Sequence, residues 1–305
     1  MKKTVLITGG TGLVGSRLSQ LLKKKGYNVR HLSRRRKLNG EFPAYFWNYE
    51  TDEIDANAFE NVNYVLHLAG ANVAGQGWTK KYKQEIVDSR VKTTALLERA
   101  IRENNVCLDG FIAASATGCY GNTGDAIADE GTEIGNSFLA NVCRMWENSA
   151  SQLADLPIRV VCVRIGIVLS TQGGALQKLL PSYRLGIGSY FGDGKMHVSW
   201  IHLDDLCRFF IEAMENSNYQ GTYNAVAPTP TTSKELGRAV AVAVGKPNSL
   251  LISAPAFALR LGMGEMAEIL LSSSRILPKR TAAAGFEWHY PDLVSAITDL
   301  LRSRI

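Results

Sequence analysis

The sequence predicts a doubly wound α/β fold, in which a parallel sheet carries helices on both faces and a smaller α+β C-terminal domain follows. Three observations predict it. Short apolar strands alternate with amphipathic helices along the first half of the chain. These strands have no polar face, which is typical of strands that are buried on both sides. A glycine-rich turn joins the first strand to the first helix. Strands that alternate with helices at this spacing are typical of a parallel sheet.

The first of these units lies within the opening residues MKKTVLITGGTGLVG. The run from Thr4 to Thr8 is apolar and partly β-branched, and a helical pattern of leucines follows from residue 13. Between them lie Gly9, Gly12 and Gly15, at spacings of three. In a strand–turn–helix unit the first glycine allows a tight turn, the second a close approach to a pyrophosphate, and the third close helix packing. Free N–H groups at the helix N-terminus favour the phosphates, so we expect a dinucleotide site here.

The remaining elements follow in the order that such a fold requires. We expect further strands at residues 28–32, 45–49, 62–68, 110–115 and 159–165, and helices at about 79–104 and 138–153. Beyond these, a helix that Asp204 or Asp205 is well placed to cap runs to about Met214. A short strand at 223–226 precedes a helix that is capped by Thr232 or Ser233 and ends near Val244.

The domain organisation follows from where this alternation loosens. Six glycines between residues 173 and 194 punctuate a loop-rich region. We therefore expect a Rossmann-type domain over residues 1–168, which also receives about 198–244. Residues 169–197 and 245–305 form the smaller substrate domain. Its tail holds a mostly apolar helix, a Pro-Lys-Arg break and a final amphipathic helix.

Composition excludes several classes of function. A net charge of +6 over 305 residues is modest, and no basic groove studded with aromatics is visible, so nucleic acid is not an expected partner. No apolar run approaches the ~20 residues that cross a bilayer, and no cleavable signal is present. The five cysteines are dispersed and include no CxxC pair, which favours reduced thiols in the cytoplasm over disulfides or zinc. The histidines form no metal-binding array, so we expect no metal.

The end of the second strand indicates which dinucleotide binds. An acidic residue there would favour NAD through the ribose 2′-hydroxyl, whereas an Arg accommodates the 2′-phosphate of NADP. The chain has Ser33-Arg34-Arg35-Arg36 at this point and no carboxylate. Forked guanidinium donors suit a phosphate, so NADP(H) is expected over NAD(H). The sequence leaves open which of Arg34, Arg35 and Arg36 makes the contact.

Other candidate residues follow the ends of neighbouring strands. Leu68-Ala69-Gly70 comes after one strand, and Ser115 to Tyr120 after another. Because ligands bind at the carboxyl ends of parallel strands, these segments and the glycine turn are expected to converge on one site.

Together, these motifs resemble the extended short-chain dehydrogenase/reductases, a group that includes sugar-nucleotide epimerases and dehydratases. The resemblance rests on Thr8-Gly9-x-x-Gly12-x-x-Gly15, Leu68-Ala69-Gly70, Tyr120-Gly121 and Trp200-Ile201-His202-x-Asp204-Asp205. The segments RIGIVL at 164–169, GGAL at 173–176 and Gly285-Phe286 look like an atypical branch. Its members are called NAD-dependent epimerase/dehydratase-like proteins, carry a C-terminal domain of unknown function, and sometimes bear an old cell-division-inhibitor label. The likeness covers the whole chain.

The chain departs from this family at its catalytic pair, a Tyr followed four residues later by a Lys. Aligning Glu147 with the acid that commonly follows the Lys puts Cys143 at the Lys position and Leu139 at the Tyr position. The Ser/Thr partner falls near Ala116, which Ser115 and Thr117 flank. The Asn that is usual in the preceding helix becomes Arg90.

Three residues could supply the missing chemistry: Tyr120 as an acid/base, Cys143 as a thiol near the nicotinamide, and His202, which as a residue before a helix cap is better explained as a structural hydrogen-bonder than as a base. Ser115, on the nicotinamide side, is a further catalytic candidate. Each has a plain alternative in packing, since a Cys on an amphipathic helix is most often a small core residue. The resemblance also implies the cofactor contacts. The expected cofactor-binding residues are Gly9, Thr11, Gly12, Leu13, Val14, Gly15, Ser33, Arg34, Leu68, Ala69, Gly70, Arg90 and Ser115.

The expected function is that of an NADP(H)-binding oxidoreductase or nucleotide-sugar epimerase-like enzyme that acts on a small molecule, such as a nucleotide sugar or a carbonyl compound. The alternative is a non-catalytic NADP(H) sensor or interaction protein, which the missing Tyr and Lys favour. Extended relatives often pair through the helices at about 79–104 and 138–153, so by analogy we expect a homodimer.

Overall fold

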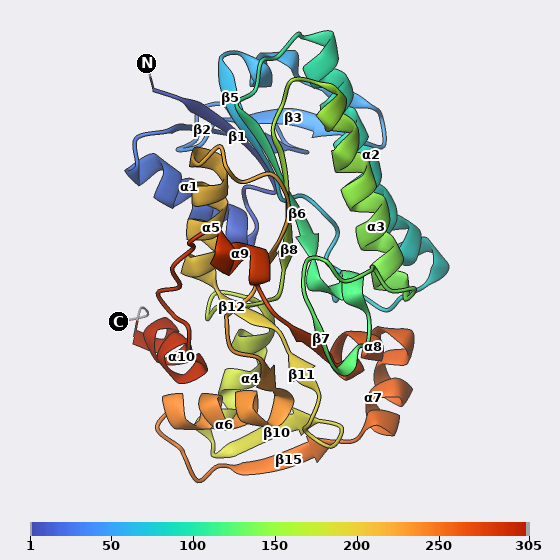
Figure 1. Cartoon of the computed structure of the whole chain (residues 1–305), viewed down its shortest axis with the longest axis vertical. Helices are drawn as coiled ribbons and strands as arrows, with labels where there is room; N and C mark the ends of the chain where they lie inside the picture. Colours follow the sequence, from blue (N-terminus) through green and yellow to red (C-terminus); the bar gives the residue numbers. More distant parts are fainter. Residues whose placement is uncertain (1, 303–305) are drawn as a thin grey trace.

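A computed structural model describes residues 2–302 of the chain. Within this range the central sheet has eight strands in the order β13-β8-β6-β5-β1-β2-β3-β4 (Figure 1). The strands are β1 (Thr4–Thr8), β2 (Asn28–Ser33), β3 (Ala44–Asn48), β4 (Glu53–Ile54), β5 (Val62–His67), β6 (Gly110–Ala116), β8 (Val160–Ile165) and β13 (Gly221–Ala225). All neighbours pair in parallel except β3 and β4. The predicted doubly wound parallel sheet is confirmed.

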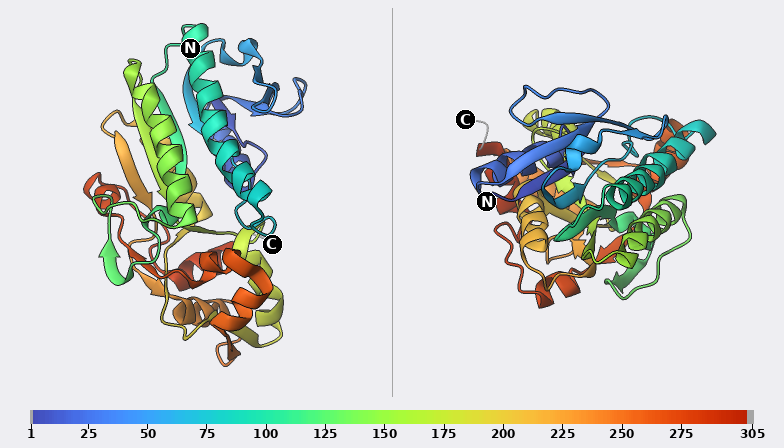
Figure 2. Two further views of the ribbon diagram at one scale, coloured as in Figure 1. Left: turned by 90° about the vertical axis from the view of Figure 1, so that its right-hand side faces the viewer. Right: turned by 90° about the horizontal axis from the view of Figure 1, so that it is seen from above.

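Helices cover both faces of this sheet, which explains why its strands lack a polar face. The covering helices are α1 (Leu13–Lys24), α2 (Lys80–Glu103), α3 (Phe138–Ser151) and α5 (Leu203–Glu215). In β1, Val5 and Ile7 pack into one core with α1 and α5, whereas Leu6 packs into a second core on the α2 side of the sheet. Figure 2 shows α2 and α3 running side by side along that second face. Each strand thus buries alternate residues on opposite faces.

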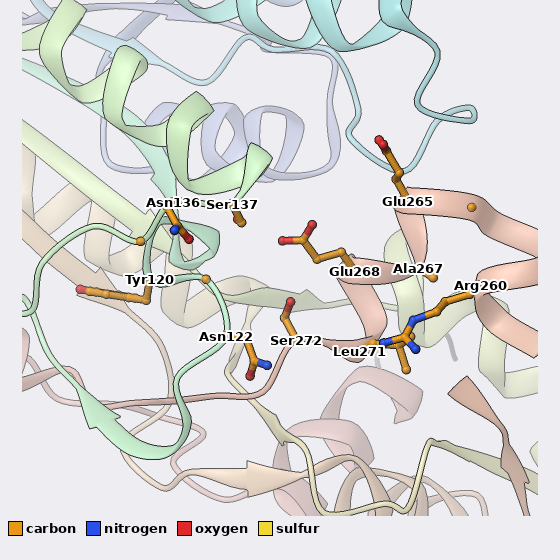
Figure 3. Close-up of a pocket in the computed structure, with 13 residues that line it drawn as sticks. Tyr120, Asn122, Asn136, Ser137, Arg260, Glu265, Ala267, Glu268, Leu271 and Ser272 are labelled. Atoms are coloured by element: carbon orange, nitrogen blue, oxygen red, sulfur yellow. The ribbon is translucent and has the colours of Figure 1, made fainter. Parts of the chain in front are cut away.

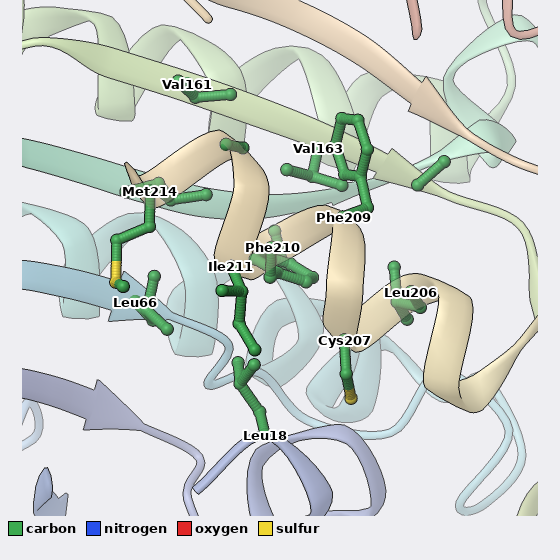
Figure 4. Close-up of a cluster of buried hydrophobic side chains, with 14 of the residues drawn as sticks. Leu18, Leu66, Val161, Val163, Leu206, Cys207, Phe209, Phe210, Ile211 and Met214 are labelled. Carbon is green, nitrogen blue, oxygen red and sulfur yellow. The ribbon is translucent and has the colours of Figure 1, made fainter. Parts of the chain in front are cut away.

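Helix α5 fills the first core with large side chains (Figure 4). Phe209, Phe210 and Met214 have no solvent-exposed surface, and they share a cluster with Leu18 of α1 and Val163 of β8. Residues from the second half of the chain therefore complete the core that the glycine turn begins. This packing fixes the N-terminus of α1 relative to the sheet.

A smaller group of elements lies beyond the carboxyl ends of the sheet strands, at the bottom of Figure 1. Its helices are α4 (Gly174–Arg184), α6 (Ser233–Ala243), α7 (Ala256–Met263), α8 (Glu268–Leu271) and α10 (Leu293–Arg302). The short helix α9 (Lys279–Ala283) lies higher, beside α5, and packs against β13. Its short strands are β7 (Gly124–Ala128), β9 (Ile167–Leu169), β10 (Ile187–Phe191), β11 (His197–Val198), β12 (Trp200–His202), β14 (Thr231–Thr232), β15 (Leu250–Ala254) and β16 (Ser274–Ile276). Of the 3-10 helices, η1 (Ala56–Phe59) and η3 (Gln152–Asp155) pack into the second core of the sheet, η2 (Thr117–Tyr120) follows β6, and η4 (Gly264–Ala267) follows α7. Helices α4, α6 and α10 share a third apolar core around Tyr183 and Trp200. The domain boundaries given above stay a prediction.

The capping of α5 differs from the expectation. The Nδ1 atom of His202 accepts a hydrogen bond of 3.0 Å from the Asp204 N–H, so His202 is the N-cap. Asp204 instead binds Arg17 at 2.7 Å, and the buried Asp205 accepts the N–H groups of His289 and Tyr290. The prediction that Asp204 or Asp205 caps the helix was wrong because both carboxylates are held by distant segments.

Other expectations were closer. The capping box of α6 forms between Thr232 and Glu235, as expected for one of the two proposed caps. The segment expected as a Pro-Lys-Arg break instead has Pro278 capping α9, which begins at Lys279. No helix within residues 2–302 is long and apolar enough to span a bilayer.

Candidate functional site

The glycine turn closes in the way that its spacing predicts. Gly9 has φ of 67°, a left-handed conformation that disfavours other residues, and its carbonyl accepts the Gly12 N–H at 2.9 Å. A Cβ atom on Gly15 would lie 2.3 Å from the Gly9 carbonyl oxygen, so α1 packs against the turn only with glycine there. The two positions explain why a side chain is excluded at each end of the turn.

The N-terminus of α1 is open to solvent at this turn. Gly12 is the N-cap, no side chain caps the helix, and the first turn holds no acidic residue. Thr11 and Gly12 are exposed, and Leu13 and Val14 begin the helix. Unpaired N–H groups and the helix dipole make such an end suited to an anion. A dinucleotide pyrophosphate therefore fits the residues present.

The end of β2 carries the arginines that the sequence singles out. The Ser33 hydroxyl accepts the Arg35 N–H at 3.2 Å, and Arg34, Arg35 and Arg36 are all exposed. Arg36 pairs with Asp55 at 3.5 Å. Within residues 2–302, Arg34 and Arg35 have no carboxylate partner. Of the three guanidiniums, these two are available for a ligand phosphate.

The end of β5 brings a second cation to the same edge of the sheet. The segment Leu68-Ala69-Gly70 follows β5, and the Arg90 guanidinium of α2 lies directly against it. A Cβ atom on Gly70 would lie 3.0 Å from Cζ of Arg90. Arg90 donates to the carbonyls of Ala71 and Ile86 at 3.1 and 2.9 Å. Burial lowers the pKa of the Arg90 guanidinium. No carboxylate pairs with Arg90 within residues 2–302, so its charge at this edge is not neutralised by an ion pair.

Arg90 also lies close to Cys143 and Trp146 of α3. Its guanidinium carbon is 4.9 Å from the centre of the Trp146 ring, a cation–π distance. The Cys143 side chain is 3% exposed, and its thiol donates to the Ala116 carbonyl at 3.5 Å. Burial raises the pKa of this thiol to about 11, with the Glu147 carboxylate acting in the same direction. Cys143 is thus a protonated thiol at neutral pH.

Ser115 belongs to a buried polar network at the end of β6. Its hydroxyl donates to Oε1 of Glu147 at 2.6 Å. Arg164 of β8 donates to both oxygens of the same carboxylate, each at 2.8 Å. Both charged side chains are almost fully buried. Glu147 therefore accepts three hydrogen bonds. Through one of them, this α3 carboxylate holds the Ser115 hydroxyl of β6 in a fixed position.

The network extends to Tyr120. Arg164 donates to the Tyr120 hydroxyl at 2.9 Å, and this hydroxyl donates to Oδ1 of Asn224 at 2.8 Å. The side chain is 4% exposed, and burial raises the pKa of the phenol above its ordinary value. In Figure 3 the Tyr120 ring points away from the adjoining pocket, toward the interior. Its hydroxyl is consequently engaged inside the protein.

A pocket of about 610 Å³ adjoins this edge, where the two parts of the molecule meet (Figure 3). One wall is formed by Tyr120, Gly121 and Asn122, which end η2 and follow it. Residues 135–137 before α3 form the second wall, and residues of α7, η4 and α8 form the third. The volume lies within the usual range for a small-molecule site.

Several residues of this site were not identified from the sequence. The sequence does contain a sign of Arg164, because this charged residue lies in RVVCVRI, a run that is otherwise mostly apolar and predicted to be a buried strand. No sequence pattern marks Asn224 or the pocket residues Arg260 and Glu268 as site residues. Within residues 2–302 no group of His, Cys, Asp or Glu is arranged to hold a metal ion.

The sheet order, the glycine turn and the open end of α1 define a Rossmann-type nucleotide-binding protein. The chain belongs to the NAD dependent epimerase/dehydratase family, whose model matches residues 5–225. A second model, for a domain of unknown function (DUF1731), matches residues 254–300. Both matches agree with the resemblance to the atypical branch of the extended short-chain dehydrogenase/reductases.

Relatives match over nearly the whole chain. The epimerase family protein Mb2239 of Mycobacterium bovis is 36% identical over 96% of each chain. The epimerase family protein SAOUHSC_00792 of Staphylococcus aureus is 34% identical over 98% of this chain and 99% of its own. A crystal structure of the human epimerase family protein SDR39U1 with NADPH superposes with a TM-score of 0.87. It is 29% identical and covers 98% of this chain and 99% of its own.

Proposed function

We propose that this chain is an NADP(H)-dependent oxidoreductase or epimerase-like enzyme acting on a small molecule. The observation that carries the cofactor choice is the end of β2, where Arg34 and Arg35 have no carboxylate partner within residues 2–302 and no acidic side chain stands in their place. A structural neighbour with 29% identity was solved with NADPH, which supports the same choice.

The proposed cofactor contacts follow from the site. Gly9, Gly12 and Gly15 would admit the pyrophosphate, with Thr11, Leu13 and Val14 supplying backbone N–H groups. Ser33 and Arg34 would hold the 2′-phosphate, and Leu68, Ala69 and Gly70 would line the adenine–ribose side. Ser115 would lie on the nicotinamide side. When bound, the nicotinamide supplies hydride chemistry.

Arg90 is the cation that we assign to the middle of this edge. Two of its five N–H donors reach backbone carbonyls, so three remain for a ligand. Arg90 also lies beside Cys143, and Cys143 is the residue at the position where the family has its Lys. We propose that Arg90 supplies the positive charge that Cys143 does not.

The hydrogen bonds of the three catalytic candidates suggest a separate role for each of them. These roles stay predictions. Tyr120 is assigned to positioning, because its hydroxyl already bonds Arg164 and Asn224 and points away from the pocket. Ser115 is assigned to orientation of the nicotinamide side through Glu147. Cys143 is assigned to packing below Arg90, since its thiol is protonated at neutral pH.

Calorimetric titration with NADPH, NADP⁺, NADH and NAD⁺ tests the cofactor assignment. In Arg34→Ala, loss of a charge-assisted phosphate contact should weaken NADPH binding by roughly 1.5–3 kcal/mol and leave NADH nearly unchanged. Arg36→Ala is the matched control, since Arg36 is already paired with Asp55. Equal losses for NADPH and NADH in Arg34→Ala would refute the assignment.

A second experiment separates an enzyme from a sensor. Oxidation of NADPH is followed with a panel of carbonyl compounds and sugar nucleotides. Turnover that depends on the panel compound supports an enzyme. Tight NADPH binding without turnover would favour the alternative of a non-catalytic NADP(H)-binding protein, for which the cysteine at the Lys position is the supporting observation.

Two further assignments accompany this proposal. We propose a homodimer through α2 and α3, which lie side by side on one face (Figure 2), and sedimentation velocity tests it. We also propose a cytoplasmic location, which the five free cysteines support. Fractionation of cells that produce the protein tests the location.

A further inference from the structure

The charges that line the 610 Å³ pocket set the kind of ligand it can take. Three of its lining side chains belong to charged residue types: Arg260, Glu265 and Glu268. Glu265 is paired with Lys83 of α2, and Figure 3 shows it pointing away from the other lining side chains. Arg260 is exposed on α7. Arg260 and Glu268 are therefore the two charged lining residues that have no ion-pair partner within residues 2–302, and the carboxylate of Glu268 is the one that points at the facing wall (Figure 3).

Glu268 is half-buried, and its carboxylate points across the pocket toward Asn136 and Ser137 (Figure 3). Within residues 2–302 its carboxylate makes no hydrogen bond or ion pair. A carboxylate accepts hydrogen bonds and donates none, so a ligand beside it must present a hydroxyl or an ammonium group. A phosphate at the same place would meet a like charge.

The rest of the lining does not supply the cations that a diphosphate needs. Arg144, which lies behind the wall at residues 135–137, already donates to the carbonyls of Ile134 and Gly135. Asn122 uses its Oδ1 atom to accept the N–H groups of Gly124 and Ser273, each at 3.2 Å. Arg260 is thus the single unpaired cation among the lining residues, so a diphosphate here would meet one guanidinium together with the like charge of Glu268.

We propose that this pocket takes a small, unphosphorylated molecule whose hydroxyl or ammonium group binds Glu268, and that it does not take a nucleoside diphosphate sugar. The inference rests on the proposed function, because the pocket serves as a substrate site only if the adjoining edge of the sheet binds the dinucleotide. It narrows that function to an oxidoreductase or epimerase whose substrate is rich in hydrogen-bond donors.

Saturation-transfer NMR on the full chain loaded with NADPH tests this proposal. The probes are glucosamine, glucose, glucose 1-phosphate and UDP-glucose, which share a sugar ring and differ in charge. With the wild type, glucosamine or glucose should give a signal, and the two phosphorylated probes should not. Glu268→Gln should weaken the sugar signal about tenfold, as expected for loss of a hydrogen bond to a charged group. Glu265→Gln, which changes the carboxylate that points away, is the matched control.

Each outcome decides the assignment. A signal from glucosamine alone identifies ammonium recognition, and a signal from glucose as well identifies hydroxyl recognition. Binding of UDP-glucose to the wild type, or a sugar signal that Glu268→Gln leaves unchanged, would overturn the proposal. Silence of all four probes with the wild type and both variants would also count against it. NADPH affinity and circular dichroism of the same samples show separately whether the cofactor site has failed or a variant has misfolded.

Discussion

The Oγ1 atom of Thr8 lies 2.8 Å from Nδ1 of His67, and this contact joins the ends of β1 and β5 beneath the proposed cofactor site. The Thr8 hydroxyl also accepts the N–H groups of Leu68 and Ala69, each at 3.0 Å. Its proton must therefore go to His67, so Nδ1 is the acceptor. Nε2 then carries the ring proton and donates to Thr94 at 3.1 Å. The histidine is held neutral, in one tautomer.

This arrangement predicts a pH dependence of stability. Burial lowers the pKa of His67 to about 3 from 6.5. Between these two pKa values, His67 is protonated in the unfolded chain but stays neutral in the folded protein. The free energy of unfolding therefore falls as the pH drops from 6.5 toward 3. The slope from this group is at most about 1.4 kcal/mol per pH unit. Urea unfolding at a series of pH values measures it.

His67→Leu provides the comparison for that slope. The variant should be less stable than the wild type at neutral pH by about 1–3 kcal/mol, because Thr8 loses its acceptor. It cannot take up a proton, so the gap between the two proteins should narrow as the pH falls. A gap that stays constant, or NMR evidence that His67 protonates near pH 6.5 in the folded protein, would contradict this account.

Gly15→Ala is expected to be severe although it adds a single methyl group. Its Cβ would lie 2.3 Å from the Gly9 carbonyl oxygen and 2.8 Å from Cα of Gly10, both backbone atoms that cannot rotate away. We expect a loss of about 1–3 kcal/mol in unfolding free energy and of NADPH binding. Gly262→Ala in α7 is the control, since nothing lies within 4 Å of its added Cβ. That change should leave stability equal or raise it by about 0.5–1 kcal/mol. Thermal unfolding with and without NADPH distinguishes the two.

Much of the fold was predictable because it depends on local signals. The buried strands, the helix that follows Gly15 and the turn between them all follow from the order of apolar and small residues. The predicted boundaries are close: the run expected at 62–68 is β5, Val62–His67, and the helix expected at 138–153 is α3, Phe138–Ser151. Even the need for Gly15 is visible in the sequence, because glycines repeated at this spacing between a strand and a helix are typical of a dinucleotide-binding turn.

The remaining features depend on contacts between distant segments, which no local pattern encodes. Asp205 looked like a helix cap, but it binds residues more than 80 positions away. Glu147 and Arg164 pair across α3 and β8, and only the charge within a buried strand hinted at it. Glu268 lies on a helix of four residues, too short to show periodicity. Its proposed role depends on residues 135–137, which the fold places on the other side of the same pocket.

The buried Glu147–Arg164 pair should be far more sensitive than ion pairs at the surface. Glu147→Gln leaves a buried guanidinium without its carboxylate, and removing one partner of such a pair typically costs about 3–5 kcal/mol. Asp88→Asn breaks the exposed pair with Lys92 at 2.8 Å and should cost less than about 1 kcal/mol. Chemical unfolding of both variants measures the difference. Losses of similar size would mean that Arg164 finds another partner.

The cysteines predict a simple labelling pattern. Cys107 is exposed, whereas Cys119, Cys143, Cys162 and Cys207 are buried. Burial raises the pKa of the Cys143 and Cys162 thiols to about 11 and about 12, and thiolates are the reactive form. In the native protein at neutral pH, a disulfide reagent should therefore modify Cys107 quickly and the other four only on unfolding.

Cys107→Ser should accordingly abolish the fast phase of labelling, while Cys143→Ser should leave it unchanged. The same experiment tests the packing role assigned to Cys143. If Cys143 reacts fast in the native protein, and NADPH slows that reaction, its thiol is open to the cofactor site. The positive charge of Arg90 would then act on a thiolate, and Cys143 would return as a candidate for the chemistry. If Cys107 is the only thiol that reacts fast, the result supports the proposal that Arg90, and not Cys143, faces the ligand.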